Sequence, residues 1–219
     1  MDCLPVPPAL RDIPGLSVAF CRTDGLLRTA DELYAALSTA FPDSHDYLQA
    51  MMGKPTTQVR LTALSLLPPL LRAAGYRAED FTLCRDRHGR PYLAPRVPAL
   101  AAPDMNLSHS AAHVVCALWC GGGRVGVDVE EPIPPDRAAR LSARFCTVGE
   151  KALSDKDPQG LSTDFTRIWT CKEALAKQAG TGQPLLFDAA QVPPGLRLLS
   201  ATLSDTGAVL SVCLPTVSP

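Results

Sequence analysis

Three consecutive glycines, residues 121–123, divide the 219-residue chain into two parts. An uninterrupted apolar run, His113–Trp119, precedes them, and a second strand-like run, Val125–Glu130, follows them. Glycine tolerates backbone angles that other residues avoid, so such a triplet is typical of a joint between elements. A chain of this length forms one large domain or two small halves that share a core. We therefore expect an N-terminal half, residues 1–122, and a C-terminal half, residues 123–219.

Each half is expected to mix helices with a few strands, because the spacing of apolar residues changes from helical to alternating along the chain. Pro68 and Pro69 must kink or split the longest helix of the first half. The first half is predicted to contain strands at Leu16–Cys21, Phe81–Arg85, Pro91–Ala94, Met105–Leu107 and His113–Trp119, and helices at Asp31–Ala40 and Thr57–Ala74. The second half is predicted to contain strands at Val125–Glu130, Leu196–Leu203 and Ala208–Leu214, and helices near Pro135–Arg144, Val148–Ser154 and Thr163–Gln178. These elements predict a mixed α/β fold of the α+β class.

Composition excludes several classes of protein. A formal net charge of −1 argues against a dedicated nucleic-acid binder, whose domain would be basic. No apolar run approaches the ~18 residues that span a bilayer, and Met1–Pro5 lacks the layout of a signal peptide. The eight cysteines are scattered without a CxxC pair, which favours reduced thiols over disulfides or a zinc site. We expect a cytoplasmic protein without a membrane span.

Two carboxylates share one face of the strand that follows the glycines. In Gly126-Val127-Asp128-Val129-Glu130, Asp128 and Glu130 point to the same side about 7 Å apart, because side chains alternate along a strand. Like charges so close repel each other unless a cation lies between them, and a hard ion such as Mg²⁺ prefers oxygen ligands. The alternative is an exposed polar face at the end of a strand.

A second polar pattern lies on the predicted helix that contains Trp169-Thr170-Cys171-Lys172-Glu173-Ala174-Leu175-Ala176-Lys177. Trp169, Glu173 and Lys177 fall four residues apart and form a single stripe. Glu173 is thus a candidate third metal carboxylate, and Lys177 a candidate phosphate contact. The alternative is an ordinary surface Glu–Lys pair, which stabilises by only ~0.3–0.5 kcal/mol. Lys172 lies off the stripe and is expected to serve phosphate or only the surface.

A third polar cluster, Asn106-Leu107-Ser108-His109-Ser110, opens directly before an apolar strand. Loops at the edge of a sheet often carry ligand contacts, and Ser108 and His109 can donate hydrogen bonds to phosphate oxygens. A serine hydrolase is the weaker interpretation, because the chain contains no GxSxG elbow.

These three segments, in this order and spacing, resemble the signature motifs of the 4′-phosphopantetheinyl transferases of the surfactin-type (Sfp-type) class. Further matches are Gly89-Arg90-Pro91-Tyr92, Phe145–Glu150 and Leu185-Leu186-Phe187-Asp188, so the resemblance covers roughly residues 60–188. It implies a pseudo-dimer of two similar α/β halves, each a small antiparallel sheet packed with helices. The active site would lie in the cleft between them, and the protein would be a monomer.

The resemblance also implies the activity and the residues that perform it. Such an enzyme transfers the 4′-phosphopantetheine group of coenzyme A to a serine of an apo acyl, polyketide or peptidyl carrier protein and releases adenosine 3′,5′-bisphosphate. Mg²⁺, or alternatively Mn²⁺, would be bound by Asp128, Glu130 and Glu173. Glu173, Lys177 and Asp128 would form the catalytic group, with Glu173 accepting the serine proton. The implied coenzyme A contacts are Arg60, Arg90, Ser108, His109, Lys177 and Lys54.

This chain departs from the family pattern where the 3′-phosphate of coenzyme A is usually held. The family often has basic residues before the long helix, whereas residues 30–53 contain no Lys or Arg and Lys54 follows them. We therefore expect better tolerance of dephospho-coenzyme A than in its relatives. Glu150 has two interpretations, a capping box with Thr147 or a role near the metal.

Two other functions stay open at this stage. One is a Mg²⁺-dependent nucleotidyltransferase or pyrophosphatase, which would turn over without a carrier protein. The other is a non-catalytic coenzyme A-binding protein, although all three acidic residues expected at the metal are present in the chain.

Overall fold

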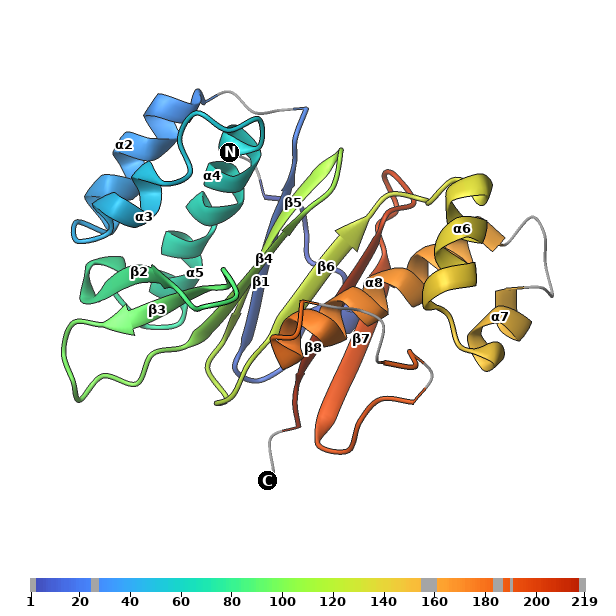
Figure 1. Cartoon of the computed structure of the whole chain (residues 1–219). Coiled ribbons are helices and arrows are strands. Elements are labelled where there is room, and N and C mark those ends of the chain that lie inside the picture. The colour runs from blue at the N-terminus through green and yellow to red at the C-terminus, as the bar shows by residue number, and fades with distance from the viewer. Residues whose placement is uncertain (1–2, 25–27, 155–160, 183–186, 190, 217–219) are drawn as a thin grey trace.

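The protein has a mixed α+β fold, as predicted, built on small antiparallel sheets packed with helices (Figure 1). The computed structural model describes residues 3–24, 28–154, 161–182, 187–189 and 191–216. Across these ranges, every helix falls short of the combined length and hydropathy that a membrane span requires. The eight cysteines, all within these ranges, are reduced rather than joined in disulfides.

The first half contains a three-stranded sheet whose order is β1-β5-β4. Its strands are β1 (Leu16–Arg22), β4 (Asp104–His109) and β5 (His113–Trp119). Four helices gather on one side of this sheet in Figure 1, namely α2 (Ala30–Ala40), α3 (His45–Gln49), α4 (Thr57–Ser65) and α5 (Leu67–Ala73). A separate hairpin pairs β2 (Phe81–Arg85) with β3 (Pro91–Pro95) after the short 3₁₀ turn Ala78–Asp80. The short helix α1 (Pro8–Arg11) lies in a stretch for which the sequence predicts no regular structure.

The second half contains another three-stranded sheet, whose order is β6-β8-β7. The strands are β6 (Gly126–Glu130), β7 (Leu196–Thr202) and β8 (Val209–Pro215). The long helix α8 (Leu161–Ala179) packs on this sheet, while α6 (Pro135–Phe145) and α7 (Val148–Ser154) lie farther from its strands (Figure 1).

The two sheets share a strand order. In each, the first strand in the chain is at one edge, the last is central, and the second is at the other edge. Apart from the short α1, the helices of each half are inserted between the first and second of these strands. This common order supports the pseudo-dimer and the division at residue 122, both of which stay predictions.

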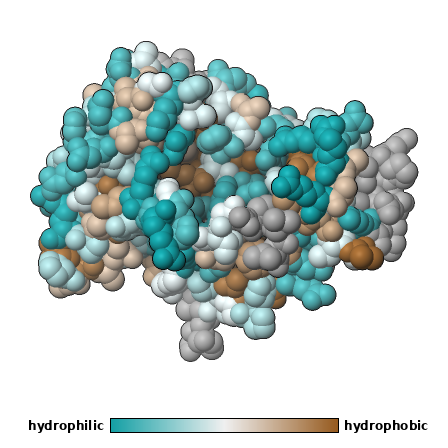
Figure 2. Space-filling model, in the orientation of Figure 1, coloured by the Kyte–Doolittle hydropathy of each residue, from teal (hydrophilic) through white to brown (hydrophobic). Residues whose placement is uncertain are grey.

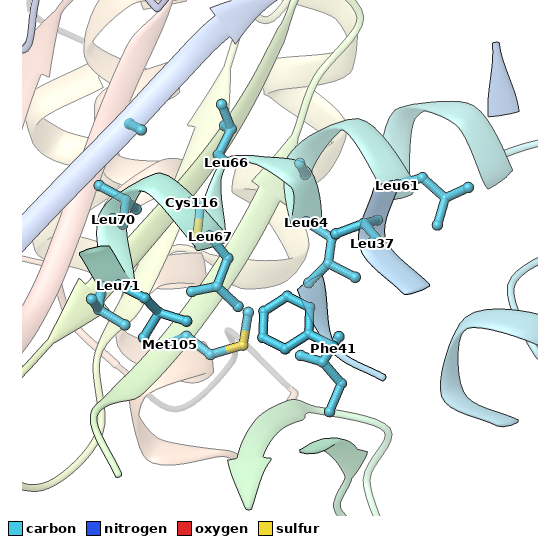
Figure 3. Packing of buried hydrophobic residues seen from close by; sticks show 14 of the residues in the cluster. Leu37, Phe41, Leu61, Leu64, Leu66, Leu67, Leu70, Leu71, Met105 and Cys116 are labelled. Carbon is cyan, nitrogen blue, oxygen red and sulfur yellow. The ribbon is translucent and has the colours of Figure 1, made fainter. Parts of the chain in front are cut away.

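The predicted interruption of the long helix is confirmed. The helix splits at Leu66, where α4 ends and α5 begins, and Pro68 and Pro69 occupy the first turn of α5. Proline is well tolerated there, because its missing N–H would have no partner inside the helix. The break lets leucines of both helices reach one core, in which Phe41, Leu67 and Met105 meet (Figure 3).

Strand β5 explains why the two halves form a single body. Its side chains alternate between two cores: Cys116 and Leu118 face the helices, while Val115, Ala117 and Trp119 face the second sheet. A strand buried on both faces needs an uninterrupted apolar sequence, which is the pattern found at 113–119.

Polar contacts across the joint hold the first edge of the second sheet against β4. The side-chain Oδ1 of Asn106 accepts a 2.9 Å hydrogen bond from the backbone N–H of Val127. Farther along, the Nδ1 of buried His113 lies 3.0 Å from Glu131 Oε1, which also accepts from Ser110. The Asn106–Ser110 segment is therefore fixed against β6 at both ends.

Candidate functional site

Asp128 lies at the centre of the candidate site. It is only 5% exposed, because β6 is covered by α8. Its Oδ1 accepts hydrogen bonds from Ser108 Oγ at 2.8 Å and from Lys177 Nζ at 2.7 Å. Its Oδ2 is buried without a hydrogen-bond partner among the residues that the structure describes. A buried carboxylate oxygen without a partner is costly, so this atom is available to a ligand.

Lys177 brings the three sequence motifs together. From the last turn of α8 its Nζ donates to Ser108 Oγ at 2.9 Å and to the Val127 carbonyl at 3.1 Å, in addition to Asp128. The helix can approach so closely because Gly126 has no side chain. A Cβ at that position would lie 1.9 Å from the carbonyl oxygen of Ala174.

The negative charge of Asp128 acts on Glu130 and Glu173, the two other acidic residues of the predicted metal set. Burial, followed by the negative charge of Asp128, raises the pKa of Glu130 to about 7, although Arg137 opposes the shift. Burial and Asp128 also raise the pKa of Glu173, while Lys177 opposes them. Both carboxylates are therefore disfavoured as anions until a cation compensates them.

These residues fit a divalent cation by their chemistry. The donors are carboxylate oxygens, which Mg²⁺ and Mn²⁺ prefer, and one oxygen of Asp128 has no partner in the described part of the chain. Within the described ranges, no three His, Cys, Asp or Glu side chains already converge as a complete ligand set. The predicted ligands Asp128, Glu130 and Glu173 thus stay a prediction that the electrostatics support.

A cavity of about 300 Å³ opens beside the site. It lies between helices α3 and α4 on one side and strands β3 and β4 on the other. Its lining residues are Tyr47, Met51, Thr56, Arg60, Ala63, Pro91, Leu107 and His109. In Figure 2 hydrophilic residues cover most of the visible face, with a few apolar residues between them toward its middle.

His109 connects the cavity to Lys177 electrostatically. Burial lowers the pKa of His109, and the positive charges of Lys177 and Arg60 lower it further. A group flanked by two cations is a favourable place for an anion. Arg60 and His109 both line the cavity, as their predicted role in binding coenzyme A requires.

Two predicted coenzyme A contacts lie elsewhere. Lys54 is exposed and is not among the residues that line the cavity. Arg90 donates to Asp104 Oδ2 at 2.6 Å, to the Val125 carbonyl at 2.7 Å and to the Lys177 carbonyl at 2.6 Å. Arg90 therefore joins the hairpin to both halves, a role that the sequence does not indicate. Contacts of Lys54 and Arg90 with the nucleotide stay predictions that this geometry does not support.

The expectation that Lys172 serves phosphate or the surface is wrong. Its side chain is fully buried and donates to Glu150 Oε1 and Oε2 at 3.1 and 3.0 Å and to the carbonyl of Phe187. Glu150 also accepts 2.8 Å and 2.7 Å hydrogen bonds from the backbone N–H groups of Thr147 and Ala189. The first of these completes the capping box, because the Thr147 hydroxyl accepts from the Glu150 N–H at 3.2 Å.

Trp169, the first residue of the polar stripe, is a packing residue. Its ring lies 5.3 Å from that of Phe145 and 6.3 Å from that of Phe165, measured between centroids. It also donates a hydrogen bond that opposes the raised pKa of Glu130. Of the matched segment 185–188, Leu185 and Leu186 lie outside the described residues.

Comparison with known proteins identifies the class. A model of the "4'-phosphopantetheinyl transferase superfamily" matches residues 124–204, which include β6 and α8. A 4'-phosphopantetheinyl transferase AcpT of Salmonella typhimurium is 30% identical over 179 residues, 77% of this chain and 92% of that protein. A 4'-phosphopantetheinyl transferase of Bacillus subtilis is 33% identical over 129 residues, 58% of this chain and 50% of that protein. The Sfp transferase of Bacillus subtilis strain 168 is 34% identical over 105 residues, 46% of this chain and 44% of that protein.

The fold, the converging motifs and these matches together place the chain in a family of transferases. The chain belongs to the 4′-phosphopantetheinyl transferase superfamily, and its resemblance to the surfactin-type class is confirmed. It spans nearly the whole Salmonella relative but about half of the Bacillus proteins.

Proposed function

We propose that this chain transfers the 4′-phosphopantetheine group of coenzyme A to a serine hydroxyl of an apo carrier protein. The observation that carries the proposal is the meeting of Lys177 and Ser108 at Oδ1 of Asp128, beside a cavity that Arg60 lines. The other oxygen of Asp128, Oδ2, has no partner among the described residues. The names of the relatives, all 4′-phosphopantetheinyl transferases, support it.

The reaction exchanges one phosphorus–oxygen bond for another. The serine oxygen of the carrier forms a bond to the β-phosphorus of coenzyme A, and the bridging pyrophosphate bond breaks. Adenosine 3′,5′-bisphosphate leaves with the electron pair of that bond. Because the carrier supplies the nucleophile and coenzyme A the phosphoryl group, the protein contributes positioning and electrostatic stabilisation.

Lys177 and Glu173 have complementary roles in this proposal. The ammonium of Lys177 donates to a pyrophosphate oxygen and so stabilises charge that develops on the leaving group. Glu173 accepts the proton of the serine hydroxyl, directly or through water. Burial and the charge of Asp128 raise the pKa of this carboxyl in the absence of the ion.

Asp128, Glu130 and Glu173 would hold Mg²⁺, or alternatively Mn²⁺, in the second half of the chain, residues 123–219. When bound, the ion supplies Lewis-acid neutralisation of the pyrophosphate charge. The first half, residues 1–122, contributes the cavity in which Arg60 and His109 meet the nucleotide end of coenzyme A, with Ser108 nearer the pyrophosphate.

The carrier surface is proposed to include α6. Arg137, Arg140 and Arg144 are exposed on this helix, and Val148 beyond it is 86% exposed. A basic and apolar surface suits the acidic helices of fatty-acid, polyketide or peptide carriers. Replacing Arg140 and Arg144 with Glu should raise the carrier KM with little change in kcat, whereas exposed Arg197→Glu serves as the control. An unchanged KM would reject this surface.

The enzyme is further proposed to act as a cytoplasmic monomer, since the two halves of one chain are expected to supply both walls of the cleft. Light scattering at working concentration measures the monomer directly, and a dimer mass would reject it. Cell fractionation with an antibody tests the compartment, and recovery with the membranes would contradict it.

Release of adenosine 3′,5′-bisphosphate, followed by chromatography with and without apo carrier, tests the function. The transferase releases it only with carrier and divalent ion present. Turnover without carrier would favour a pyrophosphatase. Coenzyme A binding without release on any carrier would favour a non-catalytic binding protein.

A further inference from the structure

Arg85, the last residue of β2, carries a positive charge that the described residues do not compensate. Its guanidinium lies over the ring of Tyr47, with the Cζ atom 4.8 Å from the ring centroid. Its Nε and Nη2 atoms are buried and donate no hydrogen bond to any described residue. Stacking on an aromatic ring leaves these in-plane donors unsatisfied, and buried donors without partners cost free energy.

Arg85 is not one of the residues that line the cavity described above, but it contacts two of them. In the β2–β3 hairpin it is paired with Pro91, and both Pro91 and Tyr47 line the cavity. Arg60 lines it as well. Among described residues, neither Arg60 nor Arg85 has an acidic partner within salt-bridge distance.

The positive charges of Arg85 and Arg60 both affect the pKa of Tyr47. Burial raises the pKa of the Tyr47 hydroxyl, and the positive charges of Arg85 and then Arg60 oppose the shift. Both guanidinium groups thus act on the same lining residue. Two guanidinium groups that have no acidic partner among the described residues, beside one cavity that His109 also lines, form an anion-binding arrangement.

We propose that Arg85, together with Arg60, binds a terminal phosphate monoester of the co-substrate. Resting on the proposed function, this group is the 3′-phosphate of coenzyme A. Coenzyme A carries a pyrophosphate and one further phosphate, and the pyrophosphate is assigned to Lys177. Only the 3′-phosphate is left for the second basic site.

The proposal reverses an expectation drawn from sequence. Residues 30–53 lack the basic side chains that often precede the long helix, which predicted tolerance of dephospho-coenzyme A. Arg85 comes from a different element, the hairpin, but lies against Tyr47 of α3. Because its guanidinium can donate two parallel hydrogen bonds to a phosphate, this enzyme discriminates against dephospho-coenzyme A.

Equilibrium binding by isothermal titration calorimetry tests the proposal, with coenzyme A and dephospho-coenzyme A as the two ligands. The wild type should bind coenzyme A roughly 10- to 100-fold more tightly, the range for charge-assisted hydrogen bonds. Arg85→Gln should lose most of this preference by weakening coenzyme A binding alone. Arg85→Lys keeps the positive charge but loses the bidentate guanidinium, so it should retain part of the preference for coenzyme A. Arg87→Gln, at an exposed neighbouring position, should match the wild type.

The inference is overturned if the wild type binds both ligands equally, or if Arg85→Gln weakens both to the same extent. It is also overturned if Arg85→Gln leaves the preference unchanged while its melting curve matches the wild type. Should Arg85→Gln fail to fold, two other variants decide. If Arg85→Lys and Arg60→Gln both keep the full preference for coenzyme A over dephospho-coenzyme A, bidentate binding of the phosphate by the arginine is rejected. The experiment measures binding and not transfer. If the protein failed to transfer phosphopantetheine to carriers, its preference for coenzyme A over dephospho-coenzyme A could still be measured. Such a failure would count against the proposed function only.

Discussion

Lys177 of α8 lies 2.7 Å from Asp128 of β6, and this contact joins residues 49 positions apart in the sequence. The same ammonium reaches Ser108 of β4, so one side chain connects all three motifs. Lys177 donates to Oδ1 of Asp128, and Oδ2 has no partner among the residues that the structure describes, so it is left for a ligand. Glu130 and Glu173 add further negative potential around it. One lysine among three carboxylates leaves an excess of negative charge, as a divalent cation site requires.

Asp128→Asn should weaken binding of a divalent ion by at least about ten-fold. Loss of a residue that only orients a metal ligand already lowers affinity by about that factor, and loss of the ligand itself should lower it at least as much. Titration of the protein with Mn²⁺, followed by electron paramagnetic resonance, measures this without any substrate. Asp136→Asn, on the exposed face of α6, is the matched control. Equal affinities in Asp128→Asn and the wild type would remove Asp128 from the ion site.

Gly126→Ala should destabilise the protein and displace α8 from β6. The new Cβ would lie 1.9 Å from the Ala174 carbonyl oxygen and 2.6 Å from the Gln178 amide nitrogen, and backbone atoms cannot move aside cheaply. Overpacking of this kind costs about 1–3 kcal/mol or more in free energy of unfolding. Gly149→Ala in α7, which meets only a Thr147 hydroxyl at 3.9 Å, should instead be neutral or stabilising. Urea unfolding of both variants measures the difference. Similar unfolding midpoints for the two variants would contradict the close approach of α8 to β6 at Gly126.

Lys172→Met should lower the free energy of unfolding by about 3–5 kcal/mol, because it leaves the buried Glu150 carboxylate without its cation. Adding Glu150→Gln should recover much of the loss, since the neutral amide oxygen can still accept from the backbone N–H groups of Thr147 and Ala189. The comparison is made by chemical denaturation of the single and double variants. A single variant as stable as the wild type would show that the pair is not buried in solution.

Stability should fall on acidification through loss of the capping box of α2. Hydrogen bonds from the backbone N–H and then the hydroxyl of Thr29 hold the pKa of Glu32 below its ordinary value of 4.5. A group whose pKa is lower in the folded state stabilises the fold above its unfolded pKa, and loses that contribution as the pH falls through the folded value. The stability difference between wild type and Glu32→Gln should therefore shrink below about pH 4.5. Asp31→Asn, one position earlier, is the control, and a difference that does not change with pH would contradict the assignment.

Elements with strong periodicity could be predicted from the sequence. The apolar run 113–119 coincides with β5, because burial on both faces leaves no polar positions to blur its limits. The helix break at Pro68-Pro69 follows from proline geometry alone. Helix α3, with five residues, was missed because a single turn carries too little periodicity to detect.

The site was predictable where residues share one element and less so where they meet across elements. Spacing along β6 and α8 placed Asp128, Glu130, Glu173 and Lys177 in common stripes. The roles of Arg90 and Lys172 depend on carbonyl groups and a carboxylate supplied by distant segments. Spacing carries no information about such partners. Arg85 was missed for the same reason, since only the fold sets it against Tyr47.

Intact-mass spectrometry of carrier proteins is the most direct test of the transfer itself. A panel of apo acyl, polyketide and peptidyl carriers would be incubated with the enzyme, coenzyme A and Mg²⁺, alongside carriers whose acceptor serine is replaced by alanine. We expect at least one carrier to gain one phosphopantetheine group, and the gain to vanish with the serine replacement, with a chelator and with Glu173→Ala. A gain that persists without the acceptor serine or in Glu173→Ala, or no gain on any carrier by an enzyme that binds coenzyme A, would contradict the account.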